Sequence, residues 1–177
     1  MKVSKLHSWQ VDTAQASEIQ ERLAGQVSRS SKVVAPHFIA GADISAKRAR
    51  GKATGAVAVL RYPELRLVET RVVTSELDFP YIPGFLSFRE SPLILSICEK
   101  LSVTPDILLV DGQGIAHPRR FGLASHLGLL LNLPTIGCAK SLLCGIHETP
   151  GAEPGSYAEM IDEGETIGAV LRTKIGV

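Results

Sequence analysis

The chain has 177 residues, of which 45% are hydrophobic and 21% charged, and its net charge is +1. This composition is typical of a globular domain and argues against intrinsic disorder. No apolar run approaches the roughly 20 residues that a membrane-spanning helix needs, and no apolar stretch follows the N-terminal lysines, so neither a membrane protein nor a secretory signal is expected. Three cysteines without a CxxC pair argue against a disulfide framework or a zinc site and favour a reducing compartment, by default the cytoplasm.

The first part of the chain predicts one helix followed by three strands. Apolar residues at helical spacing predict an amphipathic helix over residues 12–27, with Asp12 or Thr13 as its cap. The three strands are expected over residues 38–44, 54–60 and 65–73. Short connections favour antiparallel neighbours, and the basic stretch 47–52 then lies at the tip of the first hairpin.

The second part of the chain alternates helices with strands. A helical stripe that ends at Leu101 has Ser91 and Pro92 as its expected start. The apolar run 107–110 suits a strand buried on both faces, which we expect to pair in parallel with residues 38–44. The remaining elements are a helix over residues 121–131 and strands over residues 134–138 and 166–171.

This order of elements predicts an α/β protein with a ribonuclease H-like mixed sheet, in which three antiparallel strands are followed by parallel strands and helices flank the sheet. We find no internal repeat and no second domain, so one domain is expected over residues 1–177. The expected parallel pairing matters for the chemistry, because it brings together two carboxylates that are far apart in the sequence.

These two carboxylates, Asp43 and Asp111, each follow an apolar strand. Burying a lone charge at such a place is costly unless something compensates it, and a divalent cation is the natural compensator. Hard oxygen ligands without a nearby thiolate or HxH pattern select Mg²⁺ or Mn²⁺ over Zn²⁺. Either aspartate alone is better explained as a turn residue or a helix cap, but the pair on neighbouring strands favours a metal site.

Glu90 has two interpretations. With Ser87 it has the S-x-x-E spacing of a capping box at a helix start. It is equally suited to be a third carboxylate that binds the metal or orients its water. The spacing does not separate the two interpretations.

The glycine-rich segment that follows the second aspartate suits phosphate chemistry. Gly112 and Gly114 let the backbone approach a ligand closely. His117 can donate to a phosphate or exchange a proton near neutral pH. Arg119 and Arg120 can clamp phosphate oxygens.

Two further segments carry candidate residues. Lys140 follows a predicted strand and could stabilise the charge that develops on a phosphate during hydrolysis, although a surface lysine is the ordinary interpretation. The loop 80–86 combines aromatic, aliphatic and proline residues just before Glu90. An exposed loop of this kind could enter a base step as an apolar wedge, whereas a buried one would be a stiff connector.

Taken together, four segments resemble the endonuclease V family. The matching stretches are Gly-Ala-Asp-Ile-Ser at 41–45, Pro-Tyr-Ile-Pro-Gly-Phe-Leu-Ser-Phe-Arg-Glu at 80–90, residues 110–122 from Val-Asp-Gly-Gln-Gly to His-Pro-Arg-Arg-Phe-Gly, and Ile-Gly-Cys-Ala-Lys-Ser at 136–141. They occur in the family's order and span most of the chain. The second and third stretches are long enough to be highly specific.

The resemblance implies a metal-dependent nuclease that cuts DNA at the second phosphodiester bond 3′ to deoxyinosine, in the repair of deaminated adenine. It implies that Asp43 and Asp111 bind Mg²⁺, with Mn²⁺ as a substitute, and that Glu90 assists them. Lys140 and His117 would contact the region of the scissile phosphate. The expected partner is DNA containing deoxyinosine, no membrane is involved, and a monomer is the default oligomeric state.

The resemblance also implies how the deaminated base is reached. The wedge that separates the strands would consist of Tyr81, Ile82, Pro83 and Gly84. Arg119 and Arg120 would belong to the DNA-binding surface. The base pocket would be lined by the main chain of Gly84, Gly112, Gly114 and Gly137, and a poorly pairing base such as hypoxanthine would enter it at low cost.

Family members usually continue beyond Val177 with further elements that add a late histidine or acidic residue near the metal, so a domain shortened at its C-terminus is expected. Two alternatives to the deoxyinosine endonuclease therefore stay open. One is a non-catalytic remnant that binds inosine or nucleic acid without cutting it. The other is an endoribonuclease specific for inosine in RNA, because contacts to a 2′-hydroxyl are not visible in sequence spacing.

Overall fold

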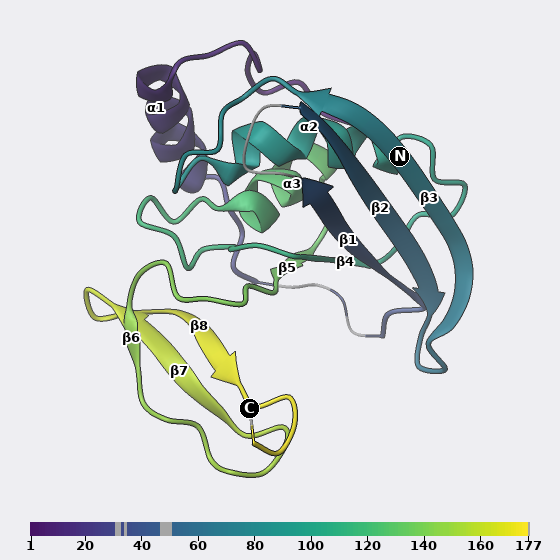
Figure 1. Cartoon of the computed structure of the whole chain (residues 1–177). Helices are drawn as coiled ribbons and strands as arrows, with labels where there is room; N and C mark the ends of the chain where they lie inside the picture. Colours follow the sequence, from purple (N-terminus) through teal and green to yellow (C-terminus); the bar gives the residue numbers. More distant parts are fainter. Residues whose placement is uncertain (31–32, 34, 47–50, 177) are drawn as a thin grey trace.

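The chain folds into a five-stranded mixed sheet with its helices and a separate three-stranded antiparallel sheet (Figure 1). This computed structural model describes residues 1–30, 33, 35–46 and 51–176. In chain order the elements are α1 Thr13–Ala24, β1 Phe38–Ala46, β2 Gly51–Arg61, β3 Arg66–Leu77, α2 Leu86–Cys98, β4 Ile107–Val110, α3 Leu123–Leu131, β5 Thr135–Gly137, β6 Ile146–His147, β7 Tyr157–Asp162 and β8 Glu165–Leu171.

The strands of the large sheet follow the order β3-β2-β1-β4-β5. β1, β2 and β3 are antiparallel neighbours, while β4 lies parallel to β1 and β5 lies parallel to β4. The mixed sheet and the parallel pairing expected from the sequence are thus confirmed. In the β1–β4 register Ala42 is opposite Val110, so the residues that follow these two positions emerge side by side.

Helices α2 and α3 cover one face of this sheet, α2 over β1 to β3 and α3 over β4 and β5. The alternation of β2 explains why, since its side chains at 53, 57 and 59 are buried whereas Thr54 is exposed. Val57, Ile97 and Leu127 are fully buried in the resulting core. Apolar burial on this face therefore fixes the sheet beneath the two helices.

Helix α2 begins earlier than the sequence indicated. The expected start at Ser91 and Pro92 is wrong, because the helix starts at Leu86 and contains Pro92. The buried Phe88 explains the extension, since it packs with Phe79 in an apolar cluster and adds a further turn to the helix. The basic stretch expected at a hairpin tip lies outside the described residues at 47–50, and its Lys52 is part of β2.

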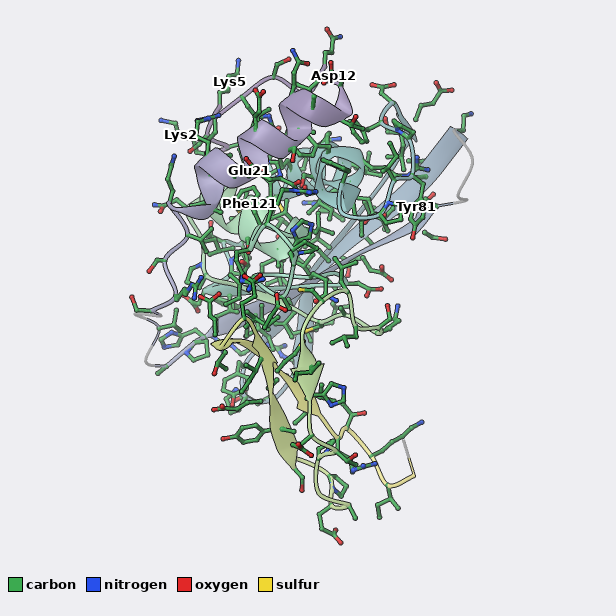
Figure 2. The ribbon with its side chains drawn as sticks, turned by 90° about the vertical axis from the view of Figure 1, so that its left-hand side faces the viewer. Lys2, Lys5, Asp12, Glu21, Tyr81 and Phe121 are labelled. Atoms are coloured by element: carbon green, nitrogen blue, oxygen red, sulfur yellow. The ribbon has the colours of Figure 1, made fainter. Side chains whose placement is uncertain are left out.

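The small sheet, β6-β7-β8, is the largest departure from the expected fold. The strand expected over residues 166–171 exists, but it pairs with β7 and does not join the large sheet. The sequence analysis did not predict β7. Glu163 and Gly164, both with positive φ angles, form the two-residue turn that joins β7 to β8. Figure 2 shows this sheet extending away from the body that carries α1.

A pair of histidines, the half-buried His7 and the buried His126, attaches the N-terminal segment to α3. The Nε2 atoms of His7 and His126 lie 2.6 Å apart, and the ring of His126 is surrounded by Trp9, Phe88 and Phe121. Burial lowers the pKa of His126 to about 3, and it also lowers the pKa of His7. Both rings are therefore neutral in the folded protein at neutral pH.

None of the helices within the described residues is long and apolar enough to cross a membrane.

The histidine pair predicts acid sensitivity of the fold. Because the folded pKa of His126 lies below the unfolded value of 6.5, its contribution is fully present above pH 6.5 and is lost as the pH falls toward 3. His126→Leu should flatten this decline by about 1.4 kcal/mol per pH unit. Urea unfolding between pH 7 and pH 4 measures the effect, with the exposed His147→Leu as control. Equal slopes for His126→Leu and the parent would contradict the prediction.

Candidate active site

Asp43 and Asp111 lie next to each other at the end of the β1–β4 pair. The backbone N–H of Asp111 donates to the carbonyl oxygen of Ala42 at 3.1 Å, which continues the parallel ladder by one residue. Both aspartates line one cleft of about 350 Å³. The expected pairing of the strands is confirmed, and it brings both aspartates to the same cleft.

The burial expected for the first aspartate is wrong. β1 continues beyond Asp43 to Ala46, and the alternation of the strand places Asp43 on the exposed side while Ala40 and Ala42 are buried. Its Oδ1 accepts a hydrogen bond from the backbone N–H of Ile44 at 2.8 Å. Solvent therefore reaches one side of the carboxylate pair.

Glu90 reaches the same cleft from α2. The capping-box interpretation is wrong, because the N-cap of α2 is Phe85, without a side-chain hydrogen bond, and Ser87 lies inside the helix. Burial is the largest cause that raises the pKa of Glu90 to about 7, and the charges of Asp43 and Asp111 act in the same direction. Glu90 is thus partly protonated at neutral pH, and its carboxyl group lies in the same cleft as the two aspartates.

The donor set of this cleft suits a hard divalent cation. Mg²⁺ is commonly held by one or two carboxylates and completes its coordination with water and substrate oxygens. Within residues 1–30, 33, 35–46 and 51–176 no three His, Cys, Asp or Glu side chains are arranged as a closed metal cage. Asp43 and Asp111 therefore offer two carboxylates to such a cation, in a cleft that also has room for water and substrate oxygens.

Lys140 supplies the positive charge of the cleft. It follows β5, and its Nζ donates to Asp111 Oδ2 at 2.5 Å while its side chain stays 83% exposed. The hydrogen bond to Asp111 is the largest cause that raises the pKa of this lysine, which is therefore cationic at neutral pH. An exposed ammonium beside the carboxylates can attract a phosphate that they would otherwise repel.

His117 lines the cleft, whereas Arg119 is not among the lining residues. His117 is buried, and its Nε2 donates to the carbonyl oxygen of Gly84 at 2.9 Å while its Nδ1 accepts from the backbone N–H of Arg119 at 3.1 Å. Arg119 donates through Nη2 to the same carbonyl oxygen at 3.1 Å. Burial is the main cause that lowers the pKa of His117, so the ring is neutral at neutral pH.

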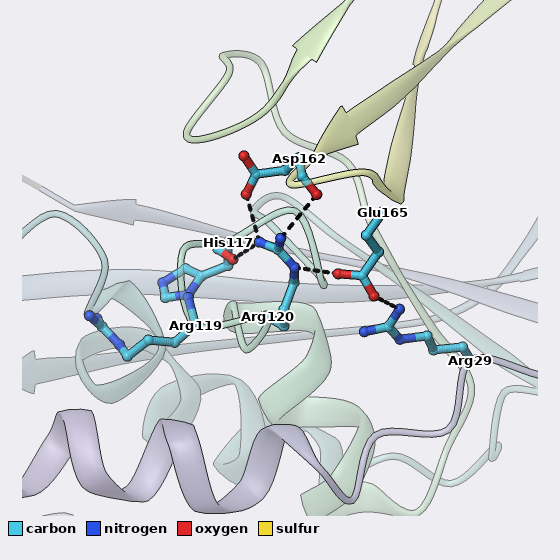
Figure 3. Close-up of polar contacts among 6 residues, drawn as sticks. All are labelled: Arg29, His117, Arg119, Arg120, Asp162 and Glu165. Carbon is cyan, nitrogen blue, oxygen red and sulfur yellow. Dashed lines mark hydrogen bonds and ion pairs between the residues drawn. The ribbon is translucent and has the colours of Figure 1, made fainter.

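Arg120 faces the small sheet. Its guanidinium forms ion pairs with Asp162 at 2.9 Å and Glu165 at 2.7 Å, and Glu165 also pairs with Arg29 (Figure 3). Its Nη1 donates to the carbonyl oxygen of His117 at 3.1 Å. In this arrangement Arg120 connects the β7–β8 hairpin to the loop behind the cleft, a role that the sequence did not indicate.

The expected wedge divides into exposed and anchored residues. Tyr81 is 48% exposed, Pro83 is exposed as well, and both line the cleft. Ile82 is half-buried and packs against the Phe79 and Phe88 cluster. The loop is therefore an exposed edge on a hydrophobic anchor, which combines the two interpretations that the sequence allowed.

The glycines expected around the base also divide into two groups. Gly84 and Gly112 line the cleft. Gly114 and Gly137 lie against each other, since a Cβ added to Gly137 would be 2.5 Å from the Gly114 nitrogen and 2.6 Å from the Gly112 oxygen. The absence of a side chain at Gly137 lets the end of β5 touch the loop after β4 through the main chain.

Gln20 was missed by the sequence analysis although it lines the cleft. It is fully buried in α1, and its side chain bonds to Gly84, Arg119 and Phe121. The signal that could have found it is its place in the helical pattern. A glutamine four residues after Ala16 and three before Leu23 occupies the buried stripe, where a polar group needs partners.

A mixed sheet that brings carboxylates and a lysine together in one open cleft defines a nuclease with a ribonuclease H-like fold. The profile of the family Endonuclease V matches residues 21–177. Endonuclease V of Trichormus variabilis is 50% identical over 100% of this chain and 80% of its own length. The chain belongs to the endonuclease V family.

Two solved structures support this assignment. The crystal structure of endonuclease V from Bacillus subtilis has a TM-score of 0.92 at 31% identity, over 100% of this chain and 78% of that one. Endonuclease V of Ciona intestinalis, in complex with a 24mer DNA containing an inosine followed by a ribo-adenosine, has a TM-score of 0.75 at 27% identity, over 89% of this chain and 76% of that one. The large sheet and the small sheet are therefore both found within a known family fold.

The contact between the two glycine-containing loops predicts a steric effect. Gly137→Ala should cost about 1–3 kcal/mol of unfolding free energy and reduce activity, because the added methyl group would push the loops apart. Gly25→Ala is the matched control, since its Cβ would meet no atom within 4 Å. Chemical unfolding of both variants tests the prediction. Equal free energies of unfolding for Gly137→Ala and the parent would contradict it.

Proposed function

We propose that this chain is a divalent-metal-dependent endonuclease that nicks DNA at the second phosphodiester bond 3′ to deoxyinosine, in the repair of deaminated adenine. The observation that carries the proposal is the adjacency of Asp43 and Asp111 in a cleft shared with Glu90 and Lys140. Family membership and the inosine-containing DNA bound by the Ciona intestinalis relative support the choice of substrate.

Asp43 and Asp111 are the residues that would hold the cation, for which we propose Mg²⁺ with Mn²⁺ as a substitute, because both prefer oxygen ligands. The ion supplies an activated water and stabilises the leaving oxygen. Glu90 lies where it can orient that water from the α2 side. Lys140 binds the phosphate and offsets the carboxylate charge, so that an anionic substrate can enter the cleft.

The exposed edge of the wedge loop explains access to the base. Tyr81 and Pro83 would enter a base step, and the cleft that they line would receive the extruded base against the main chain of Gly84 and Gly112. Hypoxanthine pairs poorly, so its extrusion costs less than that of a normal base.

We propose that residues 1–177 form one endonuclease domain. The ion pairs of Arg120, which link the small sheet to the rest of the chain, support this proposal.

An inosine-specific endoribonuclease is the second candidate. It is favoured by the ribo-adenosine that follows the inosine in the nucleic acid bound by the Ciona intestinalis relative. Cleavage of matched DNA, RNA and chimeric strands by this chain would decide between the two substrates. The cytoplasmic location and the monomeric state expected from the sequence stay predictions.

Removal of either aspartate should abolish cleavage. Asp43→Asn and Asp111→Asn each weaken the binding of the cation, and we expect nicking of an inosine-containing duplex in Mg²⁺ to fall by more than about 100-fold. Single-turnover assays on a labelled strand measure the rates. The control is Asp12→Asn, which keeps the helix cap of α1 because asparagine caps as well as aspartate. A parent-like rate in either site variant would show that the site is assigned wrongly.

Metal removal gives an independent test. A chelator should stop nicking, and added Mg²⁺ or Mn²⁺ should restore it, whereas inosine-dependent DNA binding should persist in weakened form. Nicking and fluorescence anisotropy on the same labelled duplex provide the two readouts. Inosine-dependent binding without cleavage in any divalent metal would identify a non-catalytic binding protein, and undiminished cleavage in chelator would contradict metal dependence.

A further inference from the structure

Three side chains converge on one backbone carbonyl oxygen, that of Gly84 at the end of the wedge loop. Gln20 Nε2 donates to it at 3.0 Å, His117 Nε2 at 2.9 Å and Arg119 Nη2 at 3.1 Å. A carbonyl oxygen has two lone pairs, so three donors saturate it. The donors come from α1 and from the loop after β4, which therefore hold the wedge loop from two directions.

Gln20 connects these donors. Its Oε1 accepts from Arg119 Nε at 2.7 Å, and its Nε2 also donates to the carbonyl oxygen of Phe121 at 3.0 Å. The side-chain amide thus uses its acceptor and both of its hydrogens while it is fully buried. A buried amide with every group satisfied has one orientation, and it fixes its partners in turn.

Arg119 holds the loop through a second kind of contact. Its guanidinium lies over the ring of Phe85 at 4.5 Å, directly after Gly84 in the chain. Its backbone N–H donates to Nδ1 of His117, which leaves the hydrogen of that ring on Nε2, facing Gly84. The arginine therefore faces the wedge loop and the buried glutamine, and it does not extend toward solvent as a phosphate clamp would.

We propose that Gln20 and Arg119 are positioning residues that hold the wedge loop, Tyr81 to Gly84, rigid through the Gly84 carbonyl oxygen, so that Tyr81 and Pro83 can open a duplex. This inference rests on the proposed function. Separating stacked bases costs free energy, and a loop can keep two bases apart only if the loop itself does not move when the bases press against it. Gly84 has a φ of +83°, a conformation open to glycine that needs external contacts to stay fixed.

If the wedge loop has this role, a variant that loosens it should affect duplex and single-stranded substrates differently. Inosine in a duplex has to be exposed by the wedge, whereas inosine in a single strand is already accessible. Gln20→Leu removes all three hydrogen bonds of the glutamine side chain but leaves the carboxylates and Lys140 in place. We expect single-turnover nicking of the duplex to fall about tenfold or more. Gln20 also lines the cleft, so nicking of the same strand without its complement should fall as well, but at least about fivefold less than nicking of the duplex.

The matched control is Gln26→Leu, the same change at an exposed position just after α1, which should leave both rates at the parent level. Equal losses of Gln20→Leu on duplex and single strand would overturn the proposal, because they would show a general structural role. A parent protein that cuts neither substrate would instead contradict the proposed function, so the two failures are distinguishable.

Arg119→Lys tests the network without removing a buried polar group. Lysine keeps the positive charge but cannot bond Gln20 and Gly84 with one planar fork. The same selective loss on the duplex is expected, and in the double variant with Gln20→Leu the effects should be clearly less than multiplicative. Parent-like cutting of the duplex by Arg119→Lys, or equal losses on both substrates, would overturn the proposal even where Gln20→Leu fails to fold.

Discussion

The parallel pairing of β1 with β4 is the constraint on which the site depends. It places Asp43 and Asp111, 68 positions apart in the chain, at adjacent places on one sheet. The charges of both aspartates raise the pKa of Glu90, and the lysine that follows β5 forms an ion pair with one of them, Asp111. The apolar residues under α2 and α3 stabilise the sheet and therefore hold these charged groups at fixed backbone positions.

Around this rigid centre the functional elements are held by polar contacts of different kinds. The wedge loop is connected to α1 and to the 117–120 loop by hydrogen bonds to one carbonyl oxygen. The small sheet is connected to the same loop by the ion pairs of Arg120. The side chains of two neighbouring arginines thus make different contacts. Arg120 bonds the β7–β8 hairpin (Figure 3), and Arg119 bonds Gly84 of the wedge loop.

The sequence predicted the centre of the fold better than its periphery. The strand over 107–110 was predicted with its observed bounds because its apolar run ends at charged residues, and its parallel partner followed from the element order. The start of α2 was missed because Pro92 resembles a first-turn proline, although burial of Phe88 decides the helix start. The partners of Gln20 lie 64 to 101 residues away in the chain, so no local pattern could reveal them.

The close contact of Gly137 with the main chain at 112–114 has a mechanical consequence. With no side chains between them, the two loops form a single stiff block, and Asp111 stands at one end of it and Lys140 at the other. The backbone positions from which the carboxylate and the ammonium extend are then set before any nucleic acid arrives. Adaptation to the shape of an incoming strand has to take place elsewhere, at the edge of the cleft where Tyr81 and Pro83 meet solvent.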